Sequence, residues 1–92
     1  MATAGLTWRG EHAALGLLAD GREWFGLDLV KRSRGDLTRG TVYVILDQLE
    51  HKGYVESEQE PVPVATAGYV PRRRYRITAA GRKALRAAQW NR

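Results

Sequence analysis

One helical pattern restricts the possible folds of this chain more than any other sequence feature. The apolar side chains that recur at i, i+3, i+4 and i+7 are Val42, Ile45, Leu46 and Leu49. Thr38 can cap this helix because its hydroxyl can accept a hydrogen bond from a first-turn amide, and Gly53 can end it in the left-handed conformation. The spacing therefore predicts an amphipathic helix over residues 38–53. The side chains that lie off its apolar stripe are Arg39, Thr41, Tyr43, Val44, Asp47, Gln48 and His51.

The segments on either side of this helix complete one fold. The predicted elements are helices at residues 9–19, 25–33 and 38–53, strands at 54–59 and 72–77, and a last helix from Thr78 to near Trp90. Residues 61–68, with two prolines, a glycine and no charge, form the tip of the hairpin between the strands. This order predicts an α+β winged helix-turn-helix fold, with three helices, a two-stranded β wing and a short C-terminal helix. We expect a single domain over residues 1–92.

The composition excludes several classes of protein. The chain has no cysteine, which excludes disulfides, thiolate metal sites and cysteine nucleophiles and fits a cytoplasmic protein. Its longest apolar run, residues 13–19, is far shorter than the roughly 20 residues that cross a bilayer, so we expect no membrane association. His12 and His51 are too isolated to form a metal site, and no set of catalytic residues has credible spacing. We expect neither an enzyme nor a bound cofactor.

The charges are segregated along the chain. The net charge is +5, but residues 31–40 carry +3 and residues 61–92 carry +8, whereas residues 41–60 carry −4. This asymmetry suggests a face that binds a polyanion. Many basic proteins have other roles, so charge alone leaves the partner open.

The helix at residues 38–53 has the features of a DNA-recognition helix. In the winged helix-turn-helix layout the third helix enters the major groove, where each base pair presents a distinct pattern of donors and acceptors. Arg39, Thr41 and Tyr43 are suitable for such contacts, and Gly40 allows close approach of the backbone. The start of a helix also directs its amides and positive dipole end at phosphate. The alternative is that residues 38–43 only begin a stable helix.

The second strand contributes a basic cluster. Alternation places on one face Arg72, Arg74 and Arg76, and on the other Arg73, Tyr75 and Ile77. These arginines could hold phosphates beside the groove. The partner strand, however, has alternating glutamates at Glu56, Glu58 and Glu60, which could form a ladder of cross-strand ion pairs. We expect both: Arg76 paired with a glutamate, and at least one arginine of residues 72–74 free for DNA.

A third basic group lies between the second and third helices, at Lys31, Arg32 and Arg34. In this layout the region faces the sugar-phosphate backbone, although a solvated helix end would have the same composition.

Five stretches resemble the PadR-type family of regulators. They are LLADG at 17–21, GLDLVKR at 26–32, LTRGTVY at 37–43, LDQLEHKGYV at 46–55 and PRRRYRITAAGR at 71–82. The resemblance covers about residues 14–86. It implies a dimeric winged-helix repressor of bacteria or their phages, often relieved by a small aromatic molecule. It also implies that Thr38, Gly40, Thr41 and Tyr43 face DNA and that Arg73 and Arg74 form the basic patch of the wing.

The sequence departs from the family pattern at several positions. Arg39 stands where the family usually has proline, which adds a phosphate or guanine contact. Leu27 replaces a tyrosine, and Val44 stands where a polar residue is common and could contact a thymine methyl or pack. The apolar wing tip argues against deep insertion into the minor groove. The predicted DNA-binding residues are Lys31, Arg34, Thr38, Arg39, Gly40, Thr41, Tyr43, Val44, Arg72, Arg73 and Arg74.

Dimerisation is expected to differ from that of many relatives, which continue into long C-terminal helices. In this short form the last helix would pair with the first helix and the lead-in of a second copy. The apolar candidates for that interface are Leu6, Trp8, Leu85, Ala88 and Trp90. The same residues could instead complete the core of a monomer.

The leading hypothesis is a homodimeric, sequence-specific repressor that binds a pseudo-palindromic operator in double-stranded DNA, associated with the nucleoid when bound. Two alternatives remain open. A protein-interaction module would use Tyr43, Val44 and the apolar wing tip as an adhesive surface. A small-molecule sensor would hold a flat ligand between Trp8 and Trp90.

Overall fold

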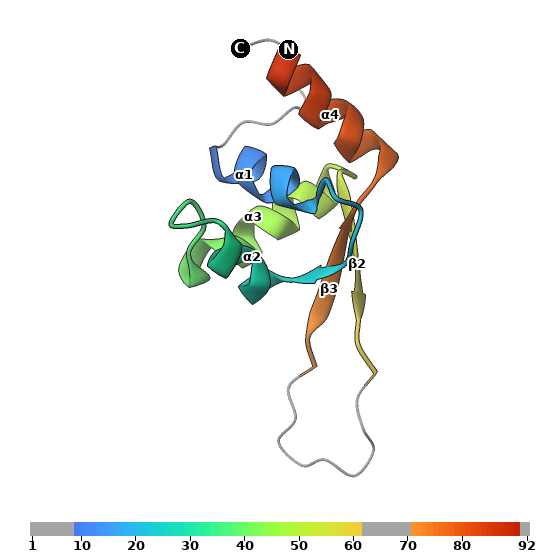
Figure 1. Cartoon of the computed structure of the whole chain (residues 1–92). Coiled ribbons are helices and arrows are strands. Elements are labelled where there is room, and N and C mark those ends of the chain that lie inside the picture. Colours follow the sequence, from blue (N-terminus) through green and yellow to red (C-terminus); the bar gives the residue numbers. More distant parts are fainter. Residues whose placement is uncertain (1–8, 62–70, 91–92) are drawn as a thin grey trace.

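The structure is a computed structural model and describes residues 9–61 and 71–90 (Figure 1). The elements of this part are α1 (Arg9–Leu18), β1 (Trp24–Phe25), α2 (Gly26–Arg32), α3 (Arg39–His51), β2 (Val55–Gln59), β3 (Arg73–Ile77) and α4 (Ala79–Trp90). The predicted elements are confirmed, with ends that differ by at most two residues. Strand β1 was not predicted. The predicted hairpin tip lies outside the described residues from position 62 onward.

Helix α3 lies at the centre of the fold because all four side chains of its apolar stripe are buried. Ile45 is 3% exposed, and Val42, Leu46 and Leu49 are fully buried. Helices α1 and α2 both pack against α3. The other buried apolar side chains of the described core are Ala14, Leu15, Leu18, Leu29, Leu37, Val55, Tyr75, Ile77 and Leu85.

Helices α1 and α3 approach closely and are joined by a buried ion pair. A Cβ atom at Gly10 would lie 2.5 Å from Cδ1 of Ile45, so a larger residue here would require the Ile45 side chain to move. At the next residue of α1, both carboxylate oxygens of Glu11 accept hydrogen bonds from Lys52 Nζ, each at 2.9 Å. Glu11 is fully buried and the Lys52 side chain is 19% exposed. Since Lys52 is the C-cap residue of α3, its positive charge also lies at the negative end of the helix dipole.

The turn between α2 and α3 is fixed by a buried serine. The Ser33 hydroxyl donates to the carbonyl of Val30 at 2.9 Å and accepts a hydrogen bond from the amide of Leu37 at 2.9 Å. Between these residues Arg34 and Gly35 have φ values of 54° and 99°, the left-handed conformation that a tight turn requires. The turn therefore sets the angle at which α3 leaves α2.

The cap of α3 differs from the prediction. Thr38 is the N-cap residue, but its side chain makes no capping hydrogen bond to the backbone. Instead Oγ1 of Thr38 lies 2.9 Å from Oγ1 of Thr41. The first-turn amides of α3 therefore donate no hydrogen bond to this hydroxyl. The predicted end of the helix is confirmed, because Gly53 has a φ of 82°.

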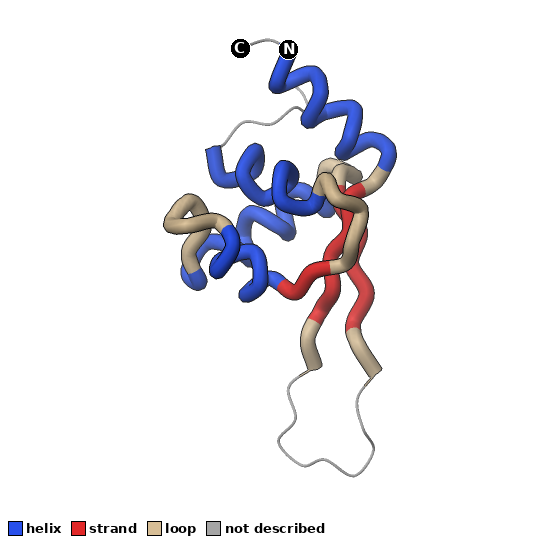
Figure 2. Tube along the Cα trace, viewed as in Figure 1, coloured by secondary structure: helices blue, strands red, loops and turns tan. Residues whose placement is uncertain are grey.

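Strand β3 is the central strand of a three-stranded antiparallel sheet in the described residues, in the order β1-β3-β2 (Figure 2). Trp24 lies opposite Tyr75 in this sheet, and Ser57 lies opposite Tyr75 on the other side. Strand β1 has only two residues, too few to show an alternating pattern in the sequence. Because β1 pairs with β3, the hairpin is hydrogen-bonded to the segment just before α2.

Thr78 links the sheet to the last helix, and this predicted cap is confirmed. Its hydroxyl accepts a hydrogen bond from the amide of Gly81 at 3.0 Å and donates to the carbonyl of Gly53 at 2.7 Å. Helix α4 packs against α1 and buries Leu85 in the core. It lies at the opposite end of the molecule from the open end of the hairpin (Figure 1).

The buried ion pair gives the first prediction. Replacing Lys52 by methionine keeps most of the aliphatic length but removes the cation that faces the buried Glu11 carboxylate. We expect the free energy of unfolding to fall by about 3 kcal/mol, the lower end of the cost of breaking a buried pair, because Lys52 is partly exposed. The matched change Lys83→Met on the exposed surface of α4 should alter it by less than about 0.5 kcal/mol. Urea denaturation of both variants measures the difference, and equal effects would contradict this role of the pair.

Candidate nucleic-acid interface

The first turn of α3 is exposed at every predicted contact residue. Thr38, Arg39, Gly40 and Thr41 are all exposed. The hydrogen bond between the two threonine hydroxyls holds their side chains together on this surface. The surface therefore presents hydroxyl groups, a guanidinium group and a stretch of backbone without a side chain at Gly40.

The outer face of α3 forms one wall of a groove, and the hairpin forms the other. This groove has a volume of about 740 Å³. Its lining residues are Tyr43, Val44, Asp47, Gln48, Glu50, Arg73 and Tyr75. Tyr43 and Val44 are 48% and 50% exposed. Tyr43 and Val44, two of the predicted contact residues of α3, thus line the same groove as Arg73 of the wing.

Arg73 lies on the α3 side of the hairpin, on the predicted face with Tyr75. Its Nε donates to the Ser57 hydroxyl at 3.1 Å, and its Nη1 lies 3.5 Å from Oε1 of Gln59. Both partners are neutral. No carboxylate within residues 9–61 and 71–90 forms a direct ion pair with Arg73.

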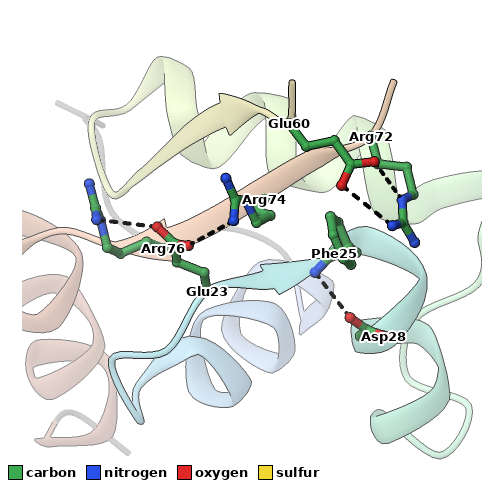
Figure 3. A network of polar contacts seen from close by, with 7 residues as sticks. All are labelled: Glu23, Phe25, Asp28, Glu60, Arg72, Arg74 and Arg76. Atoms are coloured by element: carbon green, nitrogen blue, oxygen red, sulfur yellow. Dashed lines mark hydrogen bonds and ion pairs between the residues drawn. The ribbon is translucent and has the colours of Figure 1, made fainter. Parts of the chain in front are cut away.

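Arg72 lies near the open end of the hairpin, beside Glu60 and Phe25 (Figure 3). Its guanidinium group forms an ion pair with Glu60, at 3.0 Å between Nε and Oε2. The same group lies over the ring of Phe25, 4.0 Å from the ring centroid. This cation–π contact joins the wing to the start of α2.

Arg74 and Arg76 lie on the other face of β3, where Glu23 is placed between them (Figure 3). Glu23 is 3.7 Å from Nη1 of Arg74 and 3.4 Å from Nη1 of Arg76. Arg76 is also 3.3 Å from Glu56, so the predicted pairing of Arg76 with a glutamate is confirmed. Arg74 is half-buried, and its Nε is buried without a hydrogen-bond partner among the described residues. This geometry disfavours Arg74 as a DNA contact, which stays a prediction.

A smaller hollow of about 200 Å³ connects α2, α3 and the wing. Its lining residues are Phe25, Gly26, Leu27, Asp28, Lys31, Tyr43, Arg72 and Arg73. Three predicted basic residues, Lys31, Arg72 and Arg73, therefore converge with Tyr43. The Tyr43 ring rests on the backbone of Gly26, where an added Cβ would lie 2.6 Å from Cε1 of the ring. Gly26 thus sets the position of the ring.

The remaining predicted site residues lie elsewhere. Arg34 is exposed in the turn between α2 and α3. Of the predicted dimer residues, Leu85 is 6% exposed within its own chain and Ala88 is half-buried. Leu6, Trp8 and the side chain of Trp90 lie outside the part of the chain that can be described.

Sequence analysis missed the residues that hold the wing arginines. Glu23 and Phe25 belong to β1 and the segment before it, and no local pattern relates them to β3, about 50 residues later. The sequence shows Ser57 as the neutral residue between Glu56 and Glu58. The Ser57 hydroxyl donates a hydrogen bond to Glu50 on α3, and only the folded structure brings these two residues together.

Two groups in the described part have displaced pKa values. Burial raises the pKa of the Tyr75 phenol above its ordinary value of 10.0, and the nearby positive charge of Arg73 opposes this. The pKa of the exposed Asp20 carboxyl is lowered because it accepts hydrogen bonds from the amide of Arg22 and from Nε1 of Trp24. Tyr75 therefore stays a neutral wall of the groove at pH 7.

Residues 9–61 and 71–90 contain no group of three or more side chains arranged to hold a metal ion. None of the helices described in the structure is long and apolar enough to cross a membrane.

Comparisons with known proteins agree with this geometry. The model of the transcriptional regulator PadR-like family matches residues 14–87. A PadR family transcription regulator from Clostridium difficile has a similar structure, with a TM-score of 0.74 and 21% identity over 91% of this chain and 86% of that chain. A PadR family transcriptional regulator from Eggerthella lenta is 30% identical, with a TM-score of 0.64 over 90% of this chain and 75% of that one.

A structure of Bacillus subtilis PadR in complex with operator DNA is also similar, with a TM-score of 0.73 and 20% identity. The match covers 86% of this chain but 45% of that chain. No curated protein sequence gives a significant match.

The arrangement of α1 to α3 with the following hairpin is that of a winged helix-turn-helix protein. Because the family model spans most of the sequence, the chain belongs to the PadR-like family of transcriptional regulators.

The contact between Gly26 and Tyr43 gives the second prediction. Gly26→Ala should displace the Tyr43 ring and lower the free energy of unfolding by about 1–2 kcal/mol, the usual effect of overpacking. Gly16→Ala is the matched control, because a Cβ at this exposed position of α1 meets nothing within 4 Å. It should raise the free energy of unfolding by about 0.5–1 kcal/mol. Denaturation curves and the ring resonances of Tyr43 report both effects, and a larger loss in Gly16→Ala would refute the assignment.

Proposed function

We propose that this regulator binds double-stranded DNA sequence-specifically and represses transcription. In this proposal α3 enters the major groove and Arg73 of the wing holds a phosphate beside it. One observation carries the proposal: the exposed outer face of α3 and an arginine with no carboxylate partner among the described residues line the same groove. The similar fold of Bacillus subtilis PadR, solved with operator DNA, supports it.

The proposed contacts divide into two groups. Thr41, Tyr43 and Val44 would read base edges, since these side chains project from the outer face of α3. Arg73 and Lys31 would contact phosphates, which fixes the register of the protein on DNA but carries no sequence information. Arg39 could serve either role. A chain of this kind needs no catalytic group, and we propose that it is a cytoplasmic, non-enzymatic protein.

Arg73 gives the third prediction. For duplexes enriched from a random library, Arg73→Ala should weaken binding to all sequences alike and reduce the slope of log K against log salt by about 1. Arg76→Ala removes the same charge from the far face, where Arg76 is already paired with Glu23 and Glu56. Its effect on affinity and slope should be smaller. Fluorescence anisotropy at several salt concentrations measures both variants.

Thr41→Ala provides the complementary measurement in the same assay. It should reduce discrimination between enriched and unrelated duplexes more than it reduces affinity for unrelated DNA. If Arg73→Ala changed site preference and Thr41→Ala did not, the two roles would be reversed. Failure of the unaltered protein to bind any duplex at about 50 mM salt would exclude the proposed function.

We further propose that two copies bind a pseudo-palindromic operator, with one recognition helix in each half-site about 10 bp apart. Pairing through α4 would leave α3 and the wing accessible, because α4 lies at the opposite end from the open hairpin (Figure 1). Relief by a small aromatic molecule stays a prediction, since Trp8 and the side chain of Trp90, the proposed ligand-binding groups, lie outside the part of the chain that can be described.

The dimer gives the fourth prediction. Ala88 is half-buried on α4, whereas its neighbour Ala87 is exposed. A charge placed in a dimer interface is costly to desolvate, so Ala88→Glu should favour the monomer and Ala87→Glu should not. Sedimentation over a range of concentrations distinguishes the species. A monomer at all concentrations of the unaltered protein would exclude the dimer.

A further inference from the structure

Arg73 is held by a chain of hydrogen bonds that crosses three elements. Its Nε on β3 donates to Oγ of Ser57 on β2, at 3.1 Å. The Ser57 hydroxyl donates to Oε2 of Glu50 in the last turn of α3, at 2.8 Å. Ser57 and Glu50 are both half-buried, so this chain lies between the wing and the recognition helix.

The direction of the protons in this chain is determined by its two ends. An ionised carboxylate only accepts hydrogen bonds and a guanidinium group only donates them. A hydroxyl has one proton, and Ser57 directs it to Glu50. The remaining lone pairs of its oxygen are therefore available to the Nε–H of Arg73. Glu50 thus orients Ser57, and Ser57 orients Arg73.

The serine also separates the carboxylate from the arginine. Where glutamates of the hairpin meet arginines directly, as in Glu60–Arg72 and Glu56–Arg76, the opposite charges compensate each other. At Arg73 the acceptors are the neutral Ser57 hydroxyl and the Gln59 amide oxygen, so no carboxylate of the described residues is in direct contact with the guanidinium group. Its Nη2 makes no hydrogen bond among the described residues, which leaves both of its N–H donors for a ligand.

We propose that Ser57, oriented by Glu50, is a positioning residue that fixes Arg73 for a phosphate of the DNA backbone. This inference rests on the proposed function and adds residues that do not themselves touch DNA. An arginine side chain loses much rotamer freedom when it binds, and a side chain that is already held loses less. The network therefore increases the affinity contributed by Arg73 without compensating its charge.

The test is a double-mutant cycle on the full chain. A duplex of about 30 bp, roughly three helical turns, is first enriched from a random-sequence library with the unaltered protein. Its affinity is then measured for Ser57→Ala, Arg73→Ala and the double variant. Ser57→Ala should weaken binding about five-fold, the order expected for the net contribution of one typical hydrogen bond. In the Arg73→Ala background the same change should have no effect, because Ser57 acts through Arg73.

Three further variants separate positioning from stability and from overall charge. Ser57→Thr keeps the hydroxyl and should restore affinity and the salt slope. Glu50→Gln and Glu58→Gln each remove one negative charge, but Glu58 is exposed on the other face of the hairpin. Glu50→Gln should bind the duplex more weakly than Glu58→Gln, because a neutral amide is a poorer acceptor for the Ser57 proton.

The outcomes distinguish this inference from the proposed function. An unchanged affinity in Ser57→Ala, or an equal loss in the presence and absence of Arg73, overturns the positioning role while DNA binding itself stands. A Ser57→Thr protein as weak as Ser57→Ala also overturns it. If the unaltered protein enriches no duplex, the proposed function is wrong and the positioning role is overturned with it.

Discussion

The burial of one face of α3 is the constraint on which the rest of the structure depends. Val42, Ile45, Leu46 and Leu49 remove that face from water, and a helix of this length gains most of its stability from such packing. Because the inner face is fully used, the outer face needs no contribution to the core. Its residues can therefore be chosen for contacts outside the molecule. The ion pair between Glu11 and Lys52 adds a polar connection at the far end of the helix, where it holds α3 against α1.

The hairpin separates its arginines by their partners. Arg72, Arg74 and Arg76 each lie within 4.0 Å of a glutamate, so their charges mainly connect the hairpin to itself and to the segment before α2. Arg73 faces α3 and has only neutral hydrogen-bond acceptors in the described part. A run of three adjacent arginines thus contains two side chains bound to glutamates and one positioned beside the groove. The charge of a segment is therefore a poor measure of the charge that it presents to a ligand.

The sequence predicted the features that depend on local pattern. The apolar stripe of α3, the left-handed Gly53, the cap by Thr78 and the alternation of β3 were all confirmed, because each depends on residues a few positions apart. The resemblance to a known family was confirmed as well.

Features that depend on distant segments were not predicted. Strand β1 is too short for a pattern and exists because β3 provides its hydrogen-bond partners. Thr38 is the N-cap residue as predicted, but its predicted side-chain hydrogen bond to the backbone is absent because the hydroxyl pairs with that of Thr41, one turn later. The orientation of Arg73 was not predicted either, because Ser57 and Glu50 belong to a strand and a helix that meet only after folding.

The position of β2 at the edge of the described sheet has a consequence for how the protein behaves at high concentration. An edge strand exposes backbone amides and carbonyls that can pair with a strand of another molecule, which is a common route to aggregation. Strand β2 has Glu56 and Glu58 within its five residues, and both are exposed. Two neighbouring copies of this strand would bring like charges together, so the edge resists self-association. The acidic residues of β2, whose negative charge opposes binding to a polyanion, therefore help to keep the molecule dispersed.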